Sequence, residues 1–363
     1  MSGYRGSSNR PYRGRGGGGR GRGGRGGAPS TPRPPPVPAR DITEGLRLDR
    51  PIQTLTPPTT VTGFTADVTN VQYIGSYNWL DREGSQRTIL VPGSPPEWLD
   101  RRTPYVVKED TSECFVDQNG FRIPASPLLP LIASVDFHHA NEARSFDWSS
   151  VDIITDRNGL RKLLRWVRGE VDRDFRIDLQ LAGKKTILFT RWEKHTKEHP
   201  MFTGTFGHNF EEASTKPTKG CEGSTGHHRV VQKPVPSSPK SPSQNSKPPQ
   251  SKKLNTGRVK WDEIVLQMSI AQTPHLFLGV HDRGNFEQVH KKSAASSPEL
   301  KAAEAEVKPA LLKLRRVLED IKRLVVVNSG RLSLICRDGK LDVVERISRE
   351  SCLPGEFLNK FDE

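Results

Sequence analysis

The chain has 363 residues, a formal net charge of +14 and 33% hydrophobic residues. This length allows one large domain or two small ones, and the basic excess favours polyanionic partners, nucleic acid first among them. Few, widely spaced cysteines exclude a disulfide framework: Cys114, Cys221, Cys336 and Cys352. No apolar run approaches the roughly 18 residues that span a bilayer, and the N-terminus lacks the apolar core of a signal peptide. We therefore expect a nuclear or cytoplasmic protein with no membrane partner.

Residues 1–40 form an Arg/Gly-rich and Pro-rich tail, in which 13–27 read RGRGGGGRGRGGRGG. Glycine at this density loses much backbone entropy on folding, and the tail has almost nothing apolar to bury, so we expect disorder. Guanidinium groups pair with phosphates and stack on bases, which predicts RNA contacts for the tail arginines. These are Arg13, Arg15, Arg20, Arg22 and Arg25. A solubilising tail with no defined ligand is the alternative.

The segment that follows alternates between strand and helix patterns. Residues 71–74 predict a strand ended by Gly75, and 156–167 predict an amphipathic helix. The alternation of apolar and polar residues over 175–181 predicts a half-buried strand, with 186–190 as its partner. A second low-complexity tract, 233–253, is rich in Pro, Ser and Lys and predicts a disordered linker or loop. It divides the folded part into 41–232 and 254–363, which we take as two parts of one domain.

Beyond the tract, 260–270 predict a helix, 276–280 a short buried strand and 308–324 a further helix. A terminal hairpin is expected from 331–337 and 340–347, turned at Asp338-Gly339. Together these elements predict an α+β fold, with a mixed β-sheet flanked by helices.

Several common sites are absent from the sequence. It has no Walker A loop, and no Asp-Asp-x-x-Asp run that would hold diphosphate through Mg²⁺, so no motif supports a prenyl-diphosphate synthase. A possible zinc set matches no common finger spacing and is more simply explained by surface or core side chains. It consists of His195, His199, Cys221, His227 and His228.

The most informative stretch is Gly207-His208-Asn209-Phe210-Glu211. It resembles the Gly-x-x-aromatic-Glu motif of the DXO-type RNA 5′-end decapping exonucleases. Arg157 upstream is similar to a substrate-binding arginine of that family, and Gln267 downstream is similar to its helix glutamine. Residues 274–284 then resemble the buried strand and turn that follow. Order and spacing agree over roughly residues 65–290.

The resemblance implies a PD-(D/E)XK-like nuclease core and metal-assisted hydrolysis of RNA from its 5′ end. It also implies Mg²⁺ or Mn²⁺ held by carboxylates, with Glu211 as a metal ligand and Glu211 and Gln267 as catalytic residues. RNA, through its 5′ end and single strand, is the implied substrate. A larger 5′→3′ exonuclease is a partner by family analogy.

Two acidic motifs of the family are missing or altered here. Its Glu-x-Asp strand would follow Val231, where the Pro/Ser tract begins, and that tract contains no Asp or Glu. Its Glu-x-Lys pair would fall at Lys253 and Asn255, which places a positive charge where a metal ligand is needed. Three interpretations follow: a noncatalytic RNA-binding relative, an active nuclease whose coding sequence lost a segment between 231 and 256, or a scaffold. An enzyme should lose its metal-dependent cleavage of RNA on Glu211→Ala, whereas the RNA affinity of a binding protein should not change.

Overall fold

A computed structural model of the protein describes residues 39–61, 71–81, 87–199, 204–232, 259–328 and 330–362. Contacts divide the chain into Met1–Val37 and Pro38–Glu363, and every described residue belongs to the second unit. The predicted tail arginines and the predicted linker lie outside the described residues. So do the two altered motif positions, Lys253 and Asn255.

The largest sheet has six strands in the order β1-β16-β15-β8-β9-β7. The sheet is mixed, because β7 runs parallel to β9, whereas all other neighbouring strands of this sheet are antiparallel. The turn of the β15–β16 hairpin uses left-handed φ angles of 49° at Asp338 and 79° at Gly339, as predicted for this dipeptide. The strand bounds are Gln53–Leu55 (β1), Ile153–Ile154 (β7), Phe175–Ala182 (β8), Thr186–Trp192 (β9), Arg331–Arg337 (β15) and Lys340–Glu345 (β16).

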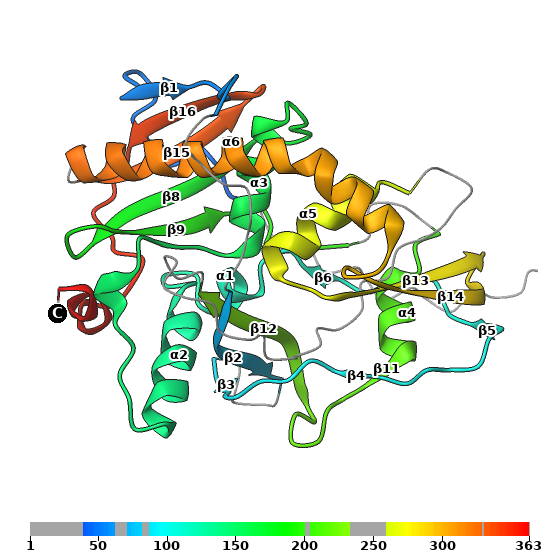
Figure 1. The fold of residues 1–363 in the computed structure, drawn as a ribbon. Helices are drawn as coiled ribbons and strands as arrows, with labels where there is room; N and C mark the ends of the chain where they lie inside the picture. The colour runs from blue at the N-terminus through cyan, green and yellow to red at the C-terminus, as the bar shows by residue number, and fades with distance from the viewer. Residues whose placement is uncertain are drawn as a thin grey trace, which may run out of the picture. The chain divides into compact units, whose positions relative to one another are not determined.

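Helices α3 (Arg157–Val167) and α6 (Pro298–Asn328) pack on one face of this sheet, as Figure 1 shows for α6, and α5 (Trp261–Ala271) packs against both helices. Apolar side chains of β8, such as Ile177, meet Leu163 of α3 and Ile321 of α6 in one buried cluster. The predicted helices at 156–167 and 260–270 are confirmed. The helix predicted at 308–324 starts ten residues earlier than expected, because Leu300 and Val307 are buried in the same cluster despite Pro309 inside the helix.

The other face of β8 is polar but also covered, so the expectation of a half-buried strand is wrong. Arg176 donates to the carboxylate of Asp178 at 2.6 Å and to the carbonyl of Glu44 at 2.6 Å. Gln180 accepts from the backbone N–H of Cys352 at 2.9 Å. The N-terminal and C-terminal segments thus seal this face, and each buried polar group finds a partner.

Strand β2 (Gln72–Leu80) continues through Gly75, where we predicted its end. A Cβ at Gly75 would lie 3.2 Å from the carbonyl oxygen of Ser134 in helix α2 (Leu129–Asn141). Glycine here therefore serves a close helix–strand approach and not a turn. Strand β2 lies between β12 (Ser224–Gln232) and β3 (Ile89–Leu90) in a three-stranded sheet.

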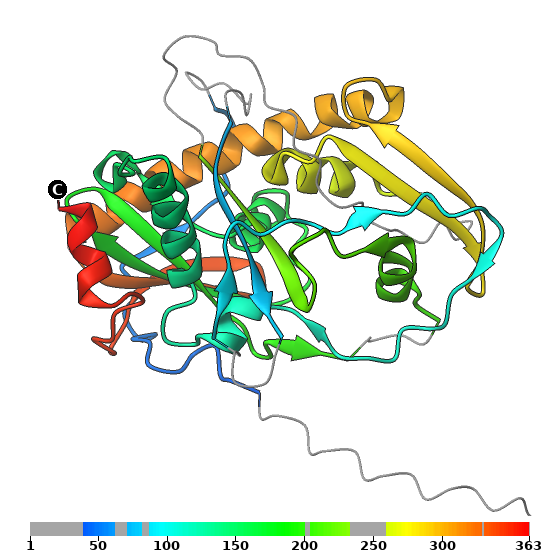
Figure 2. The same ribbon diagram turned by 90° about the horizontal axis from the view of Figure 1, so that it is seen from below.

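A second three-stranded sheet consists of β13 (His275–Asp282), β14 (Asn285–Ser293) and β5 (Tyr105–Val106). Figure 2 shows β13 and β14 between α5 and helix α4 (Gly207–Ser214). The predicted strand at 276–280 is part of β13. Two short pairs complete the sheets: β6 (Cys114–Phe115) with β10 (Lys197–Glu198), and β4 (Glu97–Trp98) with β11 (Thr215–Lys216).

Two short helices remain, α1 (Gln118–Arg122) and α7 (Gly355–Leu358). The turn that follows α7 reaches α2, where Lys360 lies 3.3 Å from the Asp136 carboxylate. No helix within the described ranges is long and apolar enough to cross a membrane. The result is an α+β arrangement with a mixed sheet flanked by helices, as the sequence predicted.

Candidate functional site

The motif that carries the resemblance forms α4. The carboxylate of Asp110 accepts backbone N–H groups of His208 at 3.3 Å and Asn209 at 2.9 Å, and so caps the helix from a neighbouring loop. Phe210 is fully buried and stacks on Phe286 of β14 with ring centroids 4.3 Å apart. The contacts of His208, Asn209 and Phe210 thus place Glu211 at a fixed point beside the β13–β14–β5 sheet.

Glu211 is partly buried, and its carboxylate has no hydrogen bond or ion pair with any described residue. Burial raises the pKa of this carboxyl above its ordinary value, and nearby His208 offsets the shift only in part. A carboxylate held in this way favours its neutral form. In chemical terms it is suited to accept a cation or a proton.

Gln267, the second predicted catalytic residue, lies on α5, across the sheet from α4. Leu278 of β13 packs in one cluster with the buried residues of α5, whereas a Cβ on the next residue, Gly279, would meet Phe210 of α4. Successive strand residues point to opposite faces, so the sheet separates the two helices. No hydrogen bond joins Gln267 to Glu211 in the described part of the chain, and their catalytic roles stay predictions.

Arg157 is the first residue of α3 and is exposed. It makes no hydrogen bond or ion pair with Glu211 or Gln267 in the ranges described. The preceding residue, Asp156, caps α3 by accepting the backbone N–H of Gly159 at 2.6 Å. The contact of Arg157 with substrate likewise stays a prediction.

Next to Arg157 lies a buried group of charges that the sequence did not indicate. We call it the Arg191 cluster; its members are Asp117, Asp156, Lys162, Arg191 and Glu193. The Arg191 side chain is 6% exposed and pairs with Asp156, with Glu193 and, at 3.5 Å, with Asp117. Lys162 completes it at 3.1 Å from Glu193.

Burial alone would lower the pKa of the Arg191 guanidinium, but the carboxylates around it, Asp156 foremost, raise it above its ordinary value. Burial also raises the pKa of the Asp117 carboxyl, which Arg191 opposes. The cluster ties α1, α3 and β9 together. Its members come from distant parts of the sequence, so no local pattern could have revealed it.

The resemblance implies a divalent ion, which would need several donor side chains near Glu211. Among the residues that the structure describes, no three His, Cys, Asp or Glu side chains gather in a group that could hold a metal. The undescribed segment 233–258, which follows β12, contains no Asp or Glu. Hard cations need several anionic oxygens, so the described residues do not fit such an ion at Glu211.

The histidines considered for zinc make other contacts. His199 lies 3.5 Å from the carboxylate of Glu113, and a ring nitrogen of His227 lies 2.9 Å from the side-chain oxygen of Asn78. His228 stacks on a tyrosine of β2 at 4.6 Å. These side chains do not form a zinc set within the described part of the protein.

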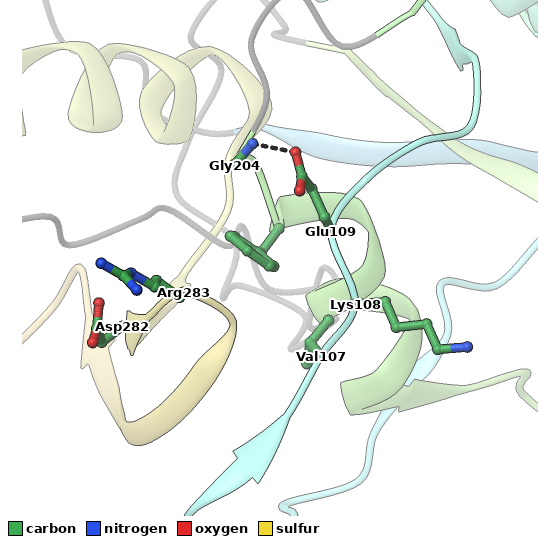
Figure 3. Close-up of a pocket in the computed structure, with 7 residues that line it drawn as sticks. Val107, Lys108, Glu109, Gly204, Asp282 and Arg283 are labelled. Atoms are coloured by element: carbon green, nitrogen blue, oxygen red, sulfur yellow. Dashed lines mark hydrogen bonds between the residues drawn. The ribbon is translucent and has the colours of Figure 1, made fainter. Parts of the chain in front are cut away.

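A cavity of about 620 Å³ opens beside the start of α4. Figure 3 shows Asp282 and Arg283 at its edge on the β13–β14 turn, and Glu109 accepting from the backbone of Gly204, while Lys108 points away. None of the predicted catalytic or substrate-binding residues lines it. Its lining is Val107, Lys108, Glu109, Gly204, Phe206, Asp282 and Arg283.

Comparison with known families decides the assignment of the chain. The family described as "Domain of unknown function (DUF8563)" matches residues 50–235, just over half of the chain. The chain belongs to this family. The DUF8563 match includes Arg157 and Glu211 but ends before Gln267. No curated protein matches the DUF8563 chain by sequence.

Solved structures show what fold this DUF8563 protein adopts. Scheffersomyces stipitis Rai1 is similar with a TM-score of 0.54 and 13% identity, over 85% of this chain and 97% of that one. Candida albicans Rai1 in complex with pU5-Mn²⁺ gives 0.52 and 11%, over 85% and 99%. K. lactis Dxo1 in complex with manganese gives 0.50 and 9%, over 81% and 95%. At such identities the likeness establishes a Rai1/Dxo1-like fold alone, in agreement with the DXO-type resemblance, whereas the PD-(D/E)XK-like nuclease core stays a prediction.

Proposed function

We propose that this protein is a noncatalytic RNA-binding relative of the RNA 5′-end decapping exonucleases, acting in the nucleus or cytoplasm. One observation carries the proposal: a Rai1/Dxo1-like fold spans most of the chain, yet no metal-holding group of side chains forms around Glu211 in its described part. The net charge of +14 and the Arg/Gly-rich tail supply the attraction for RNA. The pU5 of the Candida albicans structure suggests the ligand class, a short 5′-phosphorylated strand.

The test is incubation of the full chain with Mn²⁺ and end-labelled RNAs that carry a 5′-monophosphate or a nicotinamide-dinucleotide cap. We expect binding without product. Fluorescence anisotropy should show affinity that falls steeply with salt, weakens on deletion of residues 1–40 and is unchanged by Glu211→Ala. Mn²⁺-dependent product that disappears in Glu211→Ala would overturn the proposal and establish an enzyme.

A second candidate is an active nuclease whose coding sequence has lost a segment. It is favoured by β12, which is an edge strand of its sheet in the described part of the chain and leads directly into the acid-free tract. Such an edge is where a further, acid-bearing strand would pair. Reading the transcript across residues 231–256 tests this candidate, because an additional in-frame segment with paired acidic residues would support it.

A further inference from the structure

An exposed pair of aromatic rings lies beside the β6–β10 strand pair. Phe115 of β6 is 40% exposed and Phe121 of α1 is 47% exposed, with ring centroids 5.4 Å apart. The ammonium of Lys197 lies 4.7 Å from the first ring centroid and 4.1 Å from the second. We call these three residues the aromatic platform. Two large apolar rings next to a cation on a protein surface call for a partner that is both aromatic and anionic.

The platform is held in place by the structure beneath it. Lys197 and Phe115 are directly opposite in the antiparallel β6–β10 pair. The backbone N–H of Phe121 donates to the carbonyl of Asp117 at 3.0 Å, and the Asp117 carboxylate belongs to the buried Arg191 cluster. The rings therefore stay exposed on rigid elements, which lowers the entropic cost of binding a ligand there.

The local charges leave a cation available. Glu198 lies 3.4 Å from Arg173, and Glu113 lies 3.5 Å from His199, which carries a charge only when its ring is protonated. Lys197 forms no ion pair with any residue in the described ranges. The ammonium of Lys197 thus presents positive charge beside the rings, which favours a phosphate-bearing ligand over a cationic or purely apolar one.

The Arg/Gly-rich tail joins the fold close to the platform. The backbone N–H of Arg40 donates to the carbonyl of Lys194 at 3.0 Å, three residues before Lys197. The Arg40 guanidinium also stacks on Trp192, 3.7 Å from the ring centroid. The described part of the chain therefore begins beside the segment that leads from β9 to Lys197.

We propose that the aromatic platform binds single-stranded RNA, with bases stacked on Phe115 and Phe121 and Lys197 paired with a phosphate. This rests on the proposed RNA binding and assigns it a surface. Stacking of this kind tolerates any base sequence, because each base has an aromatic face.

The test compares the full chain with the variant Phe115→Ala/Phe121→Ala, using a fluorescent oligouridylate and an abasic strand of equal length. We expect the variant to bind oligouridylate at least about tenfold more weakly and the abasic strand as tightly as the wild type does. The leucine variant Phe115→Leu/Phe121→Leu should lose as much, and Phe115→Trp/Phe121→Trp should restore binding. Lys197→Met should reduce the slope of log affinity against log salt by about 0.7, whereas the alanine variant should keep the slope.

Phe137→Ala is the matched control, because Phe137 on α2 is 49% exposed and has no cation or ring contact in the described structure. Equal affinity of the alanine variant and the wild type for oligouridylate would overturn the platform and leave the proposed function standing. Equal weakening toward both strands would also overturn stacking. Failure of the wild type to bind either strand would instead overturn the proposed function itself. Circular dichroism and thermal melting confirm that each variant is folded.

Discussion

The Arg191 cluster and helix α4 both hold carboxylates that are partly or fully buried, but only those of the cluster have a cationic partner in the described structure. In the cluster, Asp117, Asp156 and Glu193 surround a buried guanidinium, so each negative charge has a partner. On α4, Glu211 is partly buried without a cation in the described structure, and burial raises the pKa of its carboxyl. The paired charges of the Arg191 cluster hold α1, α3 and β9 together, whereas the charge of Glu211 has no ion-pair partner among the described residues. The role of Glu211 as a metal ligand stays a prediction of the resemblance, and it would require further anionic ligands beside this carboxylate.

The largest effect should come from breaking the cluster. Arg191→Met removes its central cation and leaves three carboxylates close together, of which Asp117 and Glu193 are buried and Asp156 is 36% exposed, so repulsion and desolvation both oppose folding. We expect the free energy of unfolding to fall by about 3–5 kcal/mol. Urea titration followed by circular dichroism measures this loss.

Arg47→Met is the control, because the Arg47–Glu345 pair has the same chemistry at 53% and 54% side-chain exposure. Exposed pairs contribute about 0–1 kcal/mol, so this variant should unfold close to the wild-type midpoint. Similar losses in both variants would show that burial does not distinguish the cluster from a surface pair.

An intermediate effect should come from disturbing the sheet that carries α4. A Cβ at Gly279 would lie 2.6 Å from the ring of Phe286 and 2.8 Å from that of Phe210, and both rings are buried. Gly279→Ala should therefore destabilise the protein by about 1–3 kcal/mol through overpacking. Thermal melting with Gly355→Ala as control measures it, since no atom lies within 4 Å of a Cβ at Gly355. A neutral Gly279→Ala would mean that α4 shifts easily on the sheet.

The smallest effect concerns Glu211 and depends on pH. Its folded-state pKa lies above its ordinary value, so folding favours the protonated form, and that contribution is lost as the pH rises through the folded pKa. Glu211→Gln mimics the protonated form and should raise Tm by about 1–3 °C at neutral pH, with no gain near about pH 4. The exposed neighbour provides the control Glu212→Gln, which should show no such pH dependence. A stabilisation of Glu211→Gln that is the same at both pH values would contradict uncompensated burial of the charge.

Local patterns in the sequence predicted nine of the described elements: β2, β8, β9, β13, β15, β16, α3, α5 and α6. The 3.6-residue period identified α3 and α5, and the Asp338-Gly339 turn identified the terminal hairpin, because these structures depend on near neighbours. The motif around Glu211, with its surroundings, indicated a DXO-type fold, in line with the likeness to Rai1 and Dxo1, but helix α4 was not predicted. The limits of α6 were missed because its first ten residues are held by tertiary burial of Leu300 and Val307 and not by a continuous local period.

Other features were decided only by the tertiary structure. Gly75 has the local signature of a strand end, yet packing against Ser134 makes it part of a strand. Polar Arg176 and Asp178 suggested a solvent-facing side, yet both are buried, and Arg176 donates to the carbonyl of Glu44. The Arg191 cluster and the aromatic platform each join residues from separate segments. The sequence by itself therefore determined the predicted strands and helices, through local periodicity and turn chemistry. Long-range packing decided which charges and rings meet, because burial and pairing depend on contacts that no local pattern encodes.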